Sequence, residues 1–402
     1  MINLKNKTID NYINYLFVLY AFLIPLSRAG ISITTALLFI LWLFSNNLKQ
    51  KILFLKSNKL IFYLIAFISL SLLSLLWTDD VSSGLYYIRK YWYYLSILVI
   101  ASTANKKYLE YSISAFLIGM LISEILSYGI FFEFWTLKHG SPDSPSPFMG
   151  HIHYSVFLAF TALLLLNRFF YIQNLKLKIF YILYFLTVTA NLFINAGRTG
   201  QVAFIVSIFI VSILNVKNKL FAFISVLIFI SLLLLTAYKI SPVFKARIDL
   251  GISDIHKITQ KQNYCTSWGL RVGTWINAKE IFLNNPLLGS GVTNDMLLLR
   301  NNIDKKHPEM ICVKNMPSYH NSFIQTAVRL GIIGLFFYIM IYYSFIKLDI
   351  KDKQYYNMTI IFISVYLISS LVENVFHEQF TEAILALFTG IFIAKSRIEN
   401  EI

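Results

Sequence analysis

The chain has 402 residues, a length that suits two or three soluble domains, but its composition excludes that architecture. Apolar residues make up 57% of the chain and charged residues 14%, whereas soluble domains average roughly 45–50% apolar and about 25% charged. With a mean hydropathy of +0.63, this composition indicates a membrane protein and excludes a disordered chain, a fibrous repeat and a soluble nucleic-acid-binding protein. The net charge of +15 is typical of a membrane protein with basic cytoplasmic loops. Two cysteines are too few for a disulfide framework or a cysteine-rich metal site.

Apolar runs recur from end to end and predict an all-α polytopic membrane protein with about twelve transmembrane helices. Runs of about 15–25 residues are long enough to cross a bilayer. The first run lacks a small-residue cleavage site and is followed by further runs, so we expect it to remain as a helix rather than to be removed as a signal peptide. The predicted spans are 9–26, 31–46, 60–77, 91–104, 109–131, 152–167, 179–196, 200–215, 220–238, 321–346, 357–372 and 380–394.

The distribution of Lys and Arg between these spans predicts their orientation. With the N-terminus in the cytoplasm, the inner segments carry eighteen Lys and Arg residues. The short outer loops carry five, which are Arg28, Arg89, Lys90, Lys138 and Arg198. Because basic loops stay on the cytoplasmic side, we predict an even number of spans and both termini in the cytoplasm.

One long segment, residues 239–320, separates the ninth and tenth predicted spans on the outer face. Long segments translocate regardless of charge, and a structureless loop of this length is improbable. It contains amphipathic stretches at Trp268–Leu283 and Asn294–Arg300. We therefore predict three parts: spans one to nine in residues 1–238, a helical periplasmic cap in 239–320, and spans ten to twelve in 321–402.

Both cysteines, Cys265 and Cys312, fall in the predicted cap. On the oxidising side of the membrane they would be able to form a disulfide. Two buried free thiols are the alternative, and the sequence leaves both readings open.

Two segments on the outer side place an arginine next to glycines. Residues 195–201, Asn-Ala-Gly-Arg-Thr-Gly-Gln, form a tight turn that puts Arg198 at the start of the eighth helix, where the helix dipole favours an anion. In the predicted cap, Gly269-Leu270-Arg271 opens an amphipathic helix. The alternative without a function is that Arg198 only snorkels to the membrane surface and that Arg271 is a solvated surface residue.

A third motif, Tyr319-His320-Asn321, lies where the cap returns to the membrane, with Gly331 and Gly334 further along the tenth span. At 100° per residue His320 and Gly331 are expected on one helix face, and small residues there allow neighbouring helices to approach. Arg329 is expected on the opposite face, in another contact. A single interfacial histidine is more often structural, but near two arginines it suits a general base.

Other polar residues are weaker candidates. His151 and His153 are too few ligands for a metal ion, and Glu124 is expected to pair inside the membrane. No P-loop, dinucleotide fingerprint, Asp-x-Asp signature or Gly-x-Ser-x-Gly elbow is present, which argues against nucleotide-driven and serine-hydrolase chemistry. The remaining weak candidates are Asp79, Asp80, Glu373, His377 and Glu378.

These motifs together resemble those of the bacterial O-antigen ligases, over essentially the whole chain. His320-Asn321, nine residues and then Gly331-x-x-Gly334 resembles the His-Asn-x9-Gly-x-x-Gly signature of that family. Gly197-Arg198-Thr199-Gly200 resembles the arginine turn of the same superfamily. Arg271, Trp275 and residues 285–291, Asn-Pro-x-x-Gly-x-Gly, resemble its large periplasmic loop.

The resemblance implies a GT-C-like glycosyltransferase of the bacterial inner membrane with its active site at the periplasmic face. It implies inverting transfer of an O-antigen glycan from undecaprenyl diphosphate to a sugar hydroxyl of lipid A–core, with membrane lipids around the protein and no cofactor, metal, ATP or nucleic acid. Arg198 and Arg271 match the arginines that hold the lipid diphosphate, and His320 matches the histidine that activates the acceptor. Asn321, Gln201, His153 and Tyr319 are expected to contact or support the acceptor, although Gly150-His151-Ile152-His153 departs from the Gly-x-x-Asn-like pattern often found in the family.

Other functions remain open at this point. The O-antigen polymerases and the protein O-oligosaccharyltransferases share the arginine motifs and the donor chemistry. A polysaccharide flippase or other transporter is less favoured, because the charges gather at the outer interface and no half-repeat is evident.

Overall fold

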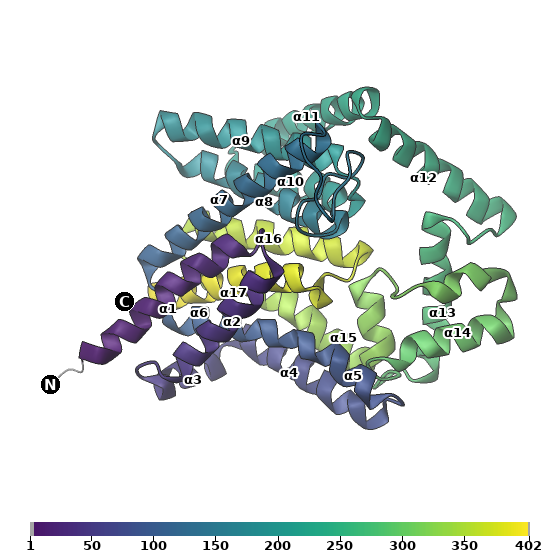
Figure 1. Cartoon of the computed structure of the whole chain (residues 1–402), viewed down its shortest axis with the longest axis horizontal. Helices are drawn as coiled ribbons and strands as arrows, with labels where there is room; N and C mark the ends of the chain where they lie inside the picture. The colour runs from purple at the N-terminus through teal and green to yellow at the C-terminus, as the bar shows by residue number, and fades with distance from the viewer. Residues whose placement is uncertain (1–3, 401–402) are drawn as a thin grey trace.

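The computed structural model describes residues 4–400, and within them every regular element is a helix. A single isolated bridge pairs Ser141 with Ser144 in the loop between α7 and α8. The chain is therefore an all-α polytopic membrane protein (Figure 1). The helices of the first two thirds of the chain are α1 (Leu4–Leu23), α2 (Arg28–Leu43), α3 (Leu48–Ser57), α4 (Lys59–Leu73), η1 (Ser74–Trp77), α5 (Val81–Ile88), η2 (Arg89–Tyr94), α6 (Leu95–Thr103), α7 (Lys106–Phe131), α8 (His151–Tyr171), α9 (Leu175–Ile194), α10 (Arg198–Asn215) and α11 (Lys219–Ile240). The remaining helices are α12 (Pro242–Lys261), α13 (Ser267–Asn284), α14 (Asn294–Lys306), η3 (Pro308–Asn315), α15 (Ser322–Ile346), α16 (Lys353–Val372), η4 (Val375–His377) and α17 (Gln379–Asn400).

All twelve predicted spans fall on helices, but fewer are long and apolar enough to cross a membrane unaided. Among the described residues eight helices meet that test, or nine if α2 and α3, which meet at an angle of 113°, form one broken span. Helices α1 and α17 are too polar, α2 is 16 residues long, and the predicted span 91–104 is divided between η2 and the nine-residue α6. The count of twelve therefore includes four helices that depend on their neighbours for burial.

The burial of the helices shows which of them form the centre of the bundle. In the most apolar 18-residue stretch of α8, 78% of the residues are buried. Every residue of α17 from Phe380 to Lys395 is buried. A helix that is buried on all sides belongs at the centre. By contrast, only 17% of the corresponding stretch of α11 is buried, although its mean hydropathy is 2.8. Such an exposed apolar helix needs lipid around it, which agrees with a multi-pass membrane protein.

The structure gathers the predicted inner segments at one end of the bundle and the predicted outer segments at the other (Figure 1). At the end nearest the termini, Lys395 pairs with Asp352 at 2.8 Å and Arg168 with Glu110 at 2.7 Å. At the opposite end, α12, α13 and α14 project to the right of the view. Residues 1–3 and 401–402 lie outside the described part of the chain, and which end faces the cytoplasm stays a prediction.

The segment predicted as a cap is helical, as expected. The amphipathic stretches at 268–283 and 294–300 lie in α13 and α14, whereas α12, which precedes them, was not predicted as a separate helix. Together with η3 the last two helices enclose a small apolar core of their own, formed by Ala278, Ile281, Leu299, Ile303, Met310, Val313, Tyr319 and Val328.

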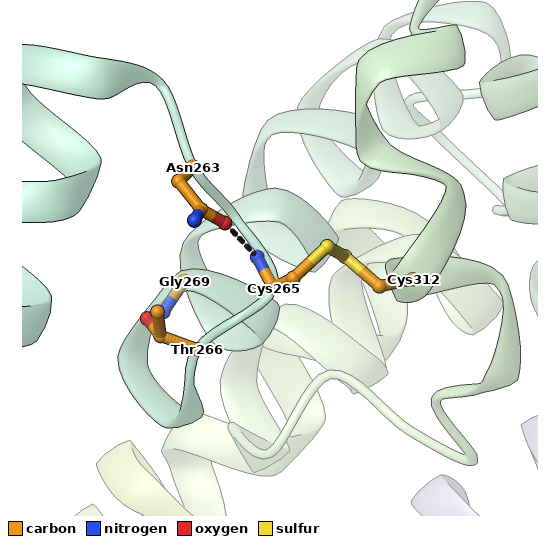
Figure 2. Close-up of a disulfide and its surroundings, with 5 residues drawn as sticks. All are labelled: Asn263, Cys265, Thr266, Gly269 and Cys312. Atoms are coloured by element: carbon orange, nitrogen blue, oxygen red, sulfur yellow. Dashed lines mark hydrogen bonds between the residues drawn. A yellow bond between two sulfur atoms is a disulfide. The ribbon is translucent and has the colours of Figure 1, made fainter.

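Cys265 and Cys312 form a disulfide, so the reading of two free thiols is wrong. The bond joins the segment before α13 to η3 across 47 residues of sequence, as Figure 2 shows. Asn263 Oδ1 accepts a hydrogen bond from the Cys265 N–H, and Thr266 caps α13 by accepting from the Gly269 N–H. These contacts fix the direction in which α13 leaves the disulfide.

Candidate functional site

Arg198 is positioned by the close approach of the turn before α10 to the first turns of α8. A Cβ atom at Gly200 would collide with the backbone of Ser155, and one at Gly197 with the backbone of His151. Glycine is therefore required at both positions, and the Gly200 N–H donates to Ser155 Oγ at 3.0 Å. This contact brings the N-termini of α8 and α10 side by side, with Arg198 at the mouth.

Three arginines line the small pocket at this point. Arg198 from α10 and Arg271 from α13, both predicted, are joined by Arg247 from α12. Arg198 also donates to Ser267 Oγ at 2.9 Å. The remaining lining residues are His151, Ile152, Ala196, Thr199, Val202, Ser267, Trp268 and Val372, and none of them is acidic.

The pocket also receives the positive ends of two helices. Gly150 and Gly197, the N-cap residues of α8 and α10, have no side chain that could cap the first turn, and in α10 the Gly200 N–H donates to Ser155 Oγ instead. Such helix ends favour an anion. Burial lowers the pKa of the Arg271 guanidinium and the Glu373 carboxylate opposes this effect, but an arginine remains charged in proteins. Three arginines and two helix N-termini make this a site for a strongly anionic group.

His320 forms a dyad with Glu373, which follows α16. Its Nδ1 lies 2.9 Å and 3.0 Å from the two carboxylate oxygens of Glu373. Burial raises the pKa of Glu373, but the hydrogen bond from His320, the Asn374 N–H and the charge of Arg271 together hold it below its usual value. A carboxylate at Nδ1 places the proton there and leaves Nε2 free to accept another.

Arg271 connects the arginine pocket to the dyad. Arg271 donates to the Val372 carbonyl at 3.1 Å and lies 3.8 Å from the Glu373 carboxylate. The same guanidinium therefore borders the anion pocket and the partner of His320. The sequence-predicted arginine and histidine are brought together through a carboxylate 53 residues beyond the histidine.

The local fold at His320 differs from the predicted continuous helix face. Helix α15 begins only at Ser322, and its backbone is broken at Gly331, where φ is +65°. His320 has a φ of +48°, in the left-handed region. The 100° per residue argument that placed His320 and Gly331 on one face is therefore wrong, because no regular helix connects them.

The break in α15 is paired with the loop after α13, residues 286–291. The N–H groups of Ser290 and Gly291 donate to the carbonyls of Val328 and Arg329, both at 2.9 Å, and the Ile332 N–H donates to Pro286. Gly331 allows the approach of the Leu287 backbone rather than that of a neighbouring helix. The glycines of the two predicted motifs thus serve one contact, which anchors the first half of α15 below His320.

Arg329 makes the separate contact that was expected of it. It donates to the Asp295 carboxylate at 2.8 Å, and its guanidinium lies 4.4 Å from the centre of the Tyr87 ring. Arg329 and Asp295 are both buried. This ion pair fixes α14 to α15.

Three of the predicted support residues are occupied by structural hydrogen bonds. The Gln201 amide donates to the carbonyls of Leu192 and Asn195, which closes the turn before α10. Tyr319 is fully buried in the core of the cap. Asn321 caps α15 by accepting from the Phe323 and Ile324 N–H groups, while its amide donates to Leu371. These side chains hold the site in place.

A larger cavity of about 480 Å³ is lined by His320. His153, the fourth predicted support residue, lines it together with His320 and Glu373. Ile152 borders both this cavity and the arginine pocket. The first turn of α8 therefore separates an anion pocket from a wider space that contains the dyad.

Sequence reasoning missed two members of this site. Glu373 was named only as a weak candidate, and Arg247 was one of eleven basic residues in the segment 239–320. Neither lies in a recognisable motif. Their proximity to the arginines and His320 depends on tertiary packing, and no signal in a single sequence reveals it.

A family model described as O-antigen ligase matches residues 183–339. The matched region contains Arg198, Arg271, His320, Gly331 and Gly334. This match supports a relationship of that part of the chain to the O-antigen ligase/polymerase superfamily. The superfamily match covers both arginine motifs, the cap and most of α15, and it ends before Glu373. No curated protein sequence gives a significant match to the chain.

Proposed function

We propose that the protein is an O-antigen ligase of the bacterial inner membrane. It transfers an O-antigen glycan from undecaprenyl diphosphate to a lipid A–core sugar hydroxyl at the periplasmic face, with inversion and without a metal ion. The observation that supports this most directly is the contact of Arg271 with both the anion pocket and Glu373, the partner of His320. Arg271 would thus link the diphosphate pocket to the partner of the base.

The roles of the residues follow from this geometry. The acceptor hydroxyl gives its proton to Nε2 of His320 while its oxygen forms the new bond to the anomeric carbon. The bond between that carbon and the diphosphate breaks, and its electron pair leaves with the diphosphate. Arg198, Arg247 and Arg271 stabilise the charge that develops there, because fixed cations act strongly where water is excluded.

The carboxylate of Glu373 stabilises the imidazolium that forms when His320 takes the proton. It also holds the ring in one tautomer, which a histidine base requires. Glu373 is a positioning residue in this scheme, since it acts through His320.

A reconstituted reaction tests the proposal. Purified protein in liposomes, given undecaprenyl-diphosphate-linked O-antigen and lipid A–core, is expected to yield glycosylated lipid A–core, also in the presence of EDTA. Failure to form this product from intact donor and acceptor would contradict ligase activity, and loss of product in EDTA would contradict metal independence.

Lipopolysaccharide from a deletion strain distinguishes the ligase from its relatives. Loss of attached glycan with polymeric lipid-linked glycan retained indicates a ligase, whereas attached glycan of one repeat indicates an O-antigen polymerase. Normal lipopolysaccharide with loss of protein glycosylation indicates a protein O-oligosaccharyltransferase. Lipid-linked glycan that accumulates on the cytoplasmic face indicates a flippase.

A further inference from the structure

We propose that a second cationic cavity, lined by Arg28, Arg89 and Lys90, binds the acceptor glycan through a phosphate or carboxylate group that it carries. The inference rests on the proposed transferase function and names a chemical property of its acceptor. The cavity measures about 640 Å³ and its other lining residues are Tyr86, Trp92, Tyr93, His153, Glu378, Gln379 and Phe380.

The cationic cavity adjoins the space that contains His320. Tyr86, Lys90, His153 and Glu378 line both. A molecule anchored in the cationic cavity therefore lies next to the space that holds the base. The arginine pocket for the donor borders the same space at Ile152, so the two ligand sites adjoin the space around His320 through different residues.

The charges in this cavity are not balanced by the protein. Three cations line it against the single carboxylate of Glu378, which lies 3.6 Å from Lys90. In the part of the chain that the structure describes, Arg28 and Arg89 have no ion pair, and both are exposed. Guanidinium groups bind phosphate and carboxylate with paired hydrogen bonds, so an anion is the ligand that these two side chains fit.

Aromatic rings beside the cations favour a carbohydrate anion over a small inorganic one. The Arg89 guanidinium lies 3.7 Å from the centre of the Tyr86 ring, and the rings of Trp92 and Tyr93 are 4.7 Å apart. The faces of such rings carry partial negative charge, and the C–H groups of a sugar ring pack well against them. Cations together with ring faces therefore suit a sugar that bears an acidic substituent.

The walls of the cavity are tied together by hydrogen bonds, which hold the Arg28 backbone and the Lys90 ammonium in place. Gln379 donates to the Arg28 carbonyl at 2.8 Å and to Ser32 Oγ at 3.0 Å. Lys90 donates to the His377 carbonyl at 3.2 Å, and the His377 ring stacks on Tyr87 at 3.4 Å. These contacts connect α2 to the start of α17, and α5 and η2 to η4.

Binding is measured apart from transfer, with the protein in nanodiscs of uncharged lipid. The probes are a phosphorylated core oligosaccharide and the same oligosaccharide after phosphatase treatment. The variant is Arg28→Gln/Arg89→Gln, and Lys138→Gln, an exposed cation outside the cavity, is the matched control. Because hydrogen bonds to charged groups contribute about 1.5–3 kcal/mol, the double variant is expected to bind the phosphorylated probe at least about tenfold more weakly.

Phosphatase treatment is expected to weaken binding to the unmodified protein by a similar factor and to leave binding to the double variant unchanged. In the transfer assay the double variant is expected to raise the KM for the acceptor without changing the KM for the donor. Charge-dependent binding in a protein without transfer activity would support the cavity and contradict the proposed function. The inference would be overturned if active protein bound the probe equally well with or without its phosphate and with or without the two arginines. Displacement of the probe by phosphatidylglycerol nanodiscs would also overturn it.

Discussion

Arg198 and Arg271 are 73 positions apart in the sequence, yet both face one pocket without an acidic wall. Replacing either with alanine is expected to abolish glycan transfer at normal protein levels, because the leaving diphosphate loses a fixed cation. Lysine at either position is expected to restore part of the activity, since it keeps the charge but not the paired hydrogen bonds. Turnover of lipid-linked donor measures this effect, and Arg300→Ala, a cap arginine outside the pocket, is the control.

An Ala variant of Arg198 or Arg271 that keeps normal turnover would show that this arginine only anchors its helix. Arg247 provides an internal comparison, because it lines the same pocket from α12 and is exposed. We expect Arg247→Ala to have a smaller effect than either of the other two substitutions.

His320 and Glu373 together set the expected dependence on pH. His320→Ala is expected to reduce turnover by about 10²- to 10⁴-fold with donor binding intact, the usual contribution of a general base. Because the pKa of Glu373 is lowered, its carboxylate stays charged throughout the neutral range, and its ion pair is lost only as the pH falls below its usual 4.5. Activity is therefore expected to be retained through the neutral range and to be lost on the acidic side as the Glu373 carboxylate becomes protonated below pH 4.5.

Glu373→Gln tests the coupling within the dyad. Without the carboxylate the imidazolium is less stable, so turnover is expected to fall, and the acidic limb of the pH–rate profile that follows protonation of Glu373 is expected to disappear. The profile is measured with saturating donor. An unchanged acidic limb in this variant would indicate that Glu373 has no electrostatic effect on the base.

At the scale of single elements, the break in α15 is the feature that positions His320. Gly331→Ala is expected to destabilise the protein by about 1–3 kcal/mol. Its φ is +65° and a Cβ atom would meet the Leu287 carbonyl. Gly251→Ala is a matched control, because its Cβ would lie 3.9 Å from the nearest atom, in the middle of α12. Thermal unfolding measures both, and equal melting temperatures for the two variants would contradict the role given to the break.

The disulfide is a property of the cap alone. Cys265→Ser/Cys312→Ser is expected to lower the stability of the cap by about 2–4 kcal/mol, as is typical for a bond that closes a long loop. Hydrogen exchange is expected to increase in α13 and η3 and to remain unchanged in α8 and α17. Increased exchange throughout the bundle would show instead that the cap and the membrane helices unfold together.

At the scale of the whole molecule, orientation is the prediction on which the site's location depends. Cysteine labelling is expected to report residues 217 and 350 on the cytoplasmic side and residues 140 and 255 on the periplasmic side. The reason is the excess of basic residues in the predicted inner loops. The structure places the two groups of segments at opposite ends of the bundle, so a cytoplasmic signal at residue 255 would invert the entire assignment.

The sequence by itself determined the all-helical membrane architecture, because apolar runs of bilayer length are a local property of the chain. It also predicted the helical cap and named Arg198, Arg271 and His320, since glycine turns and short motifs are local too. Four helices are too short (α2 and α6) or too polar (α1 and α17) to cross a membrane alone. The sequence did not distinguish them from independent spans, because their burial depends on neighbouring helices.

Only the tertiary structure decided what surrounds the predicted residues. Glu373 reaches His320, and Arg247 joins the arginine pocket, through the packing of segments that no periodicity relates. The fold brings the Cα atoms of Cys265 and Cys312 to 5.6 Å from each other, which allows a disulfide in place of two free thiols. The kink at Gly331 arises because the loop at 286–291 supplies backbone hydrogen bonds that replace those of the helix. Each of these contacts joins residues distant in sequence, and local patterns carry no information about such distances.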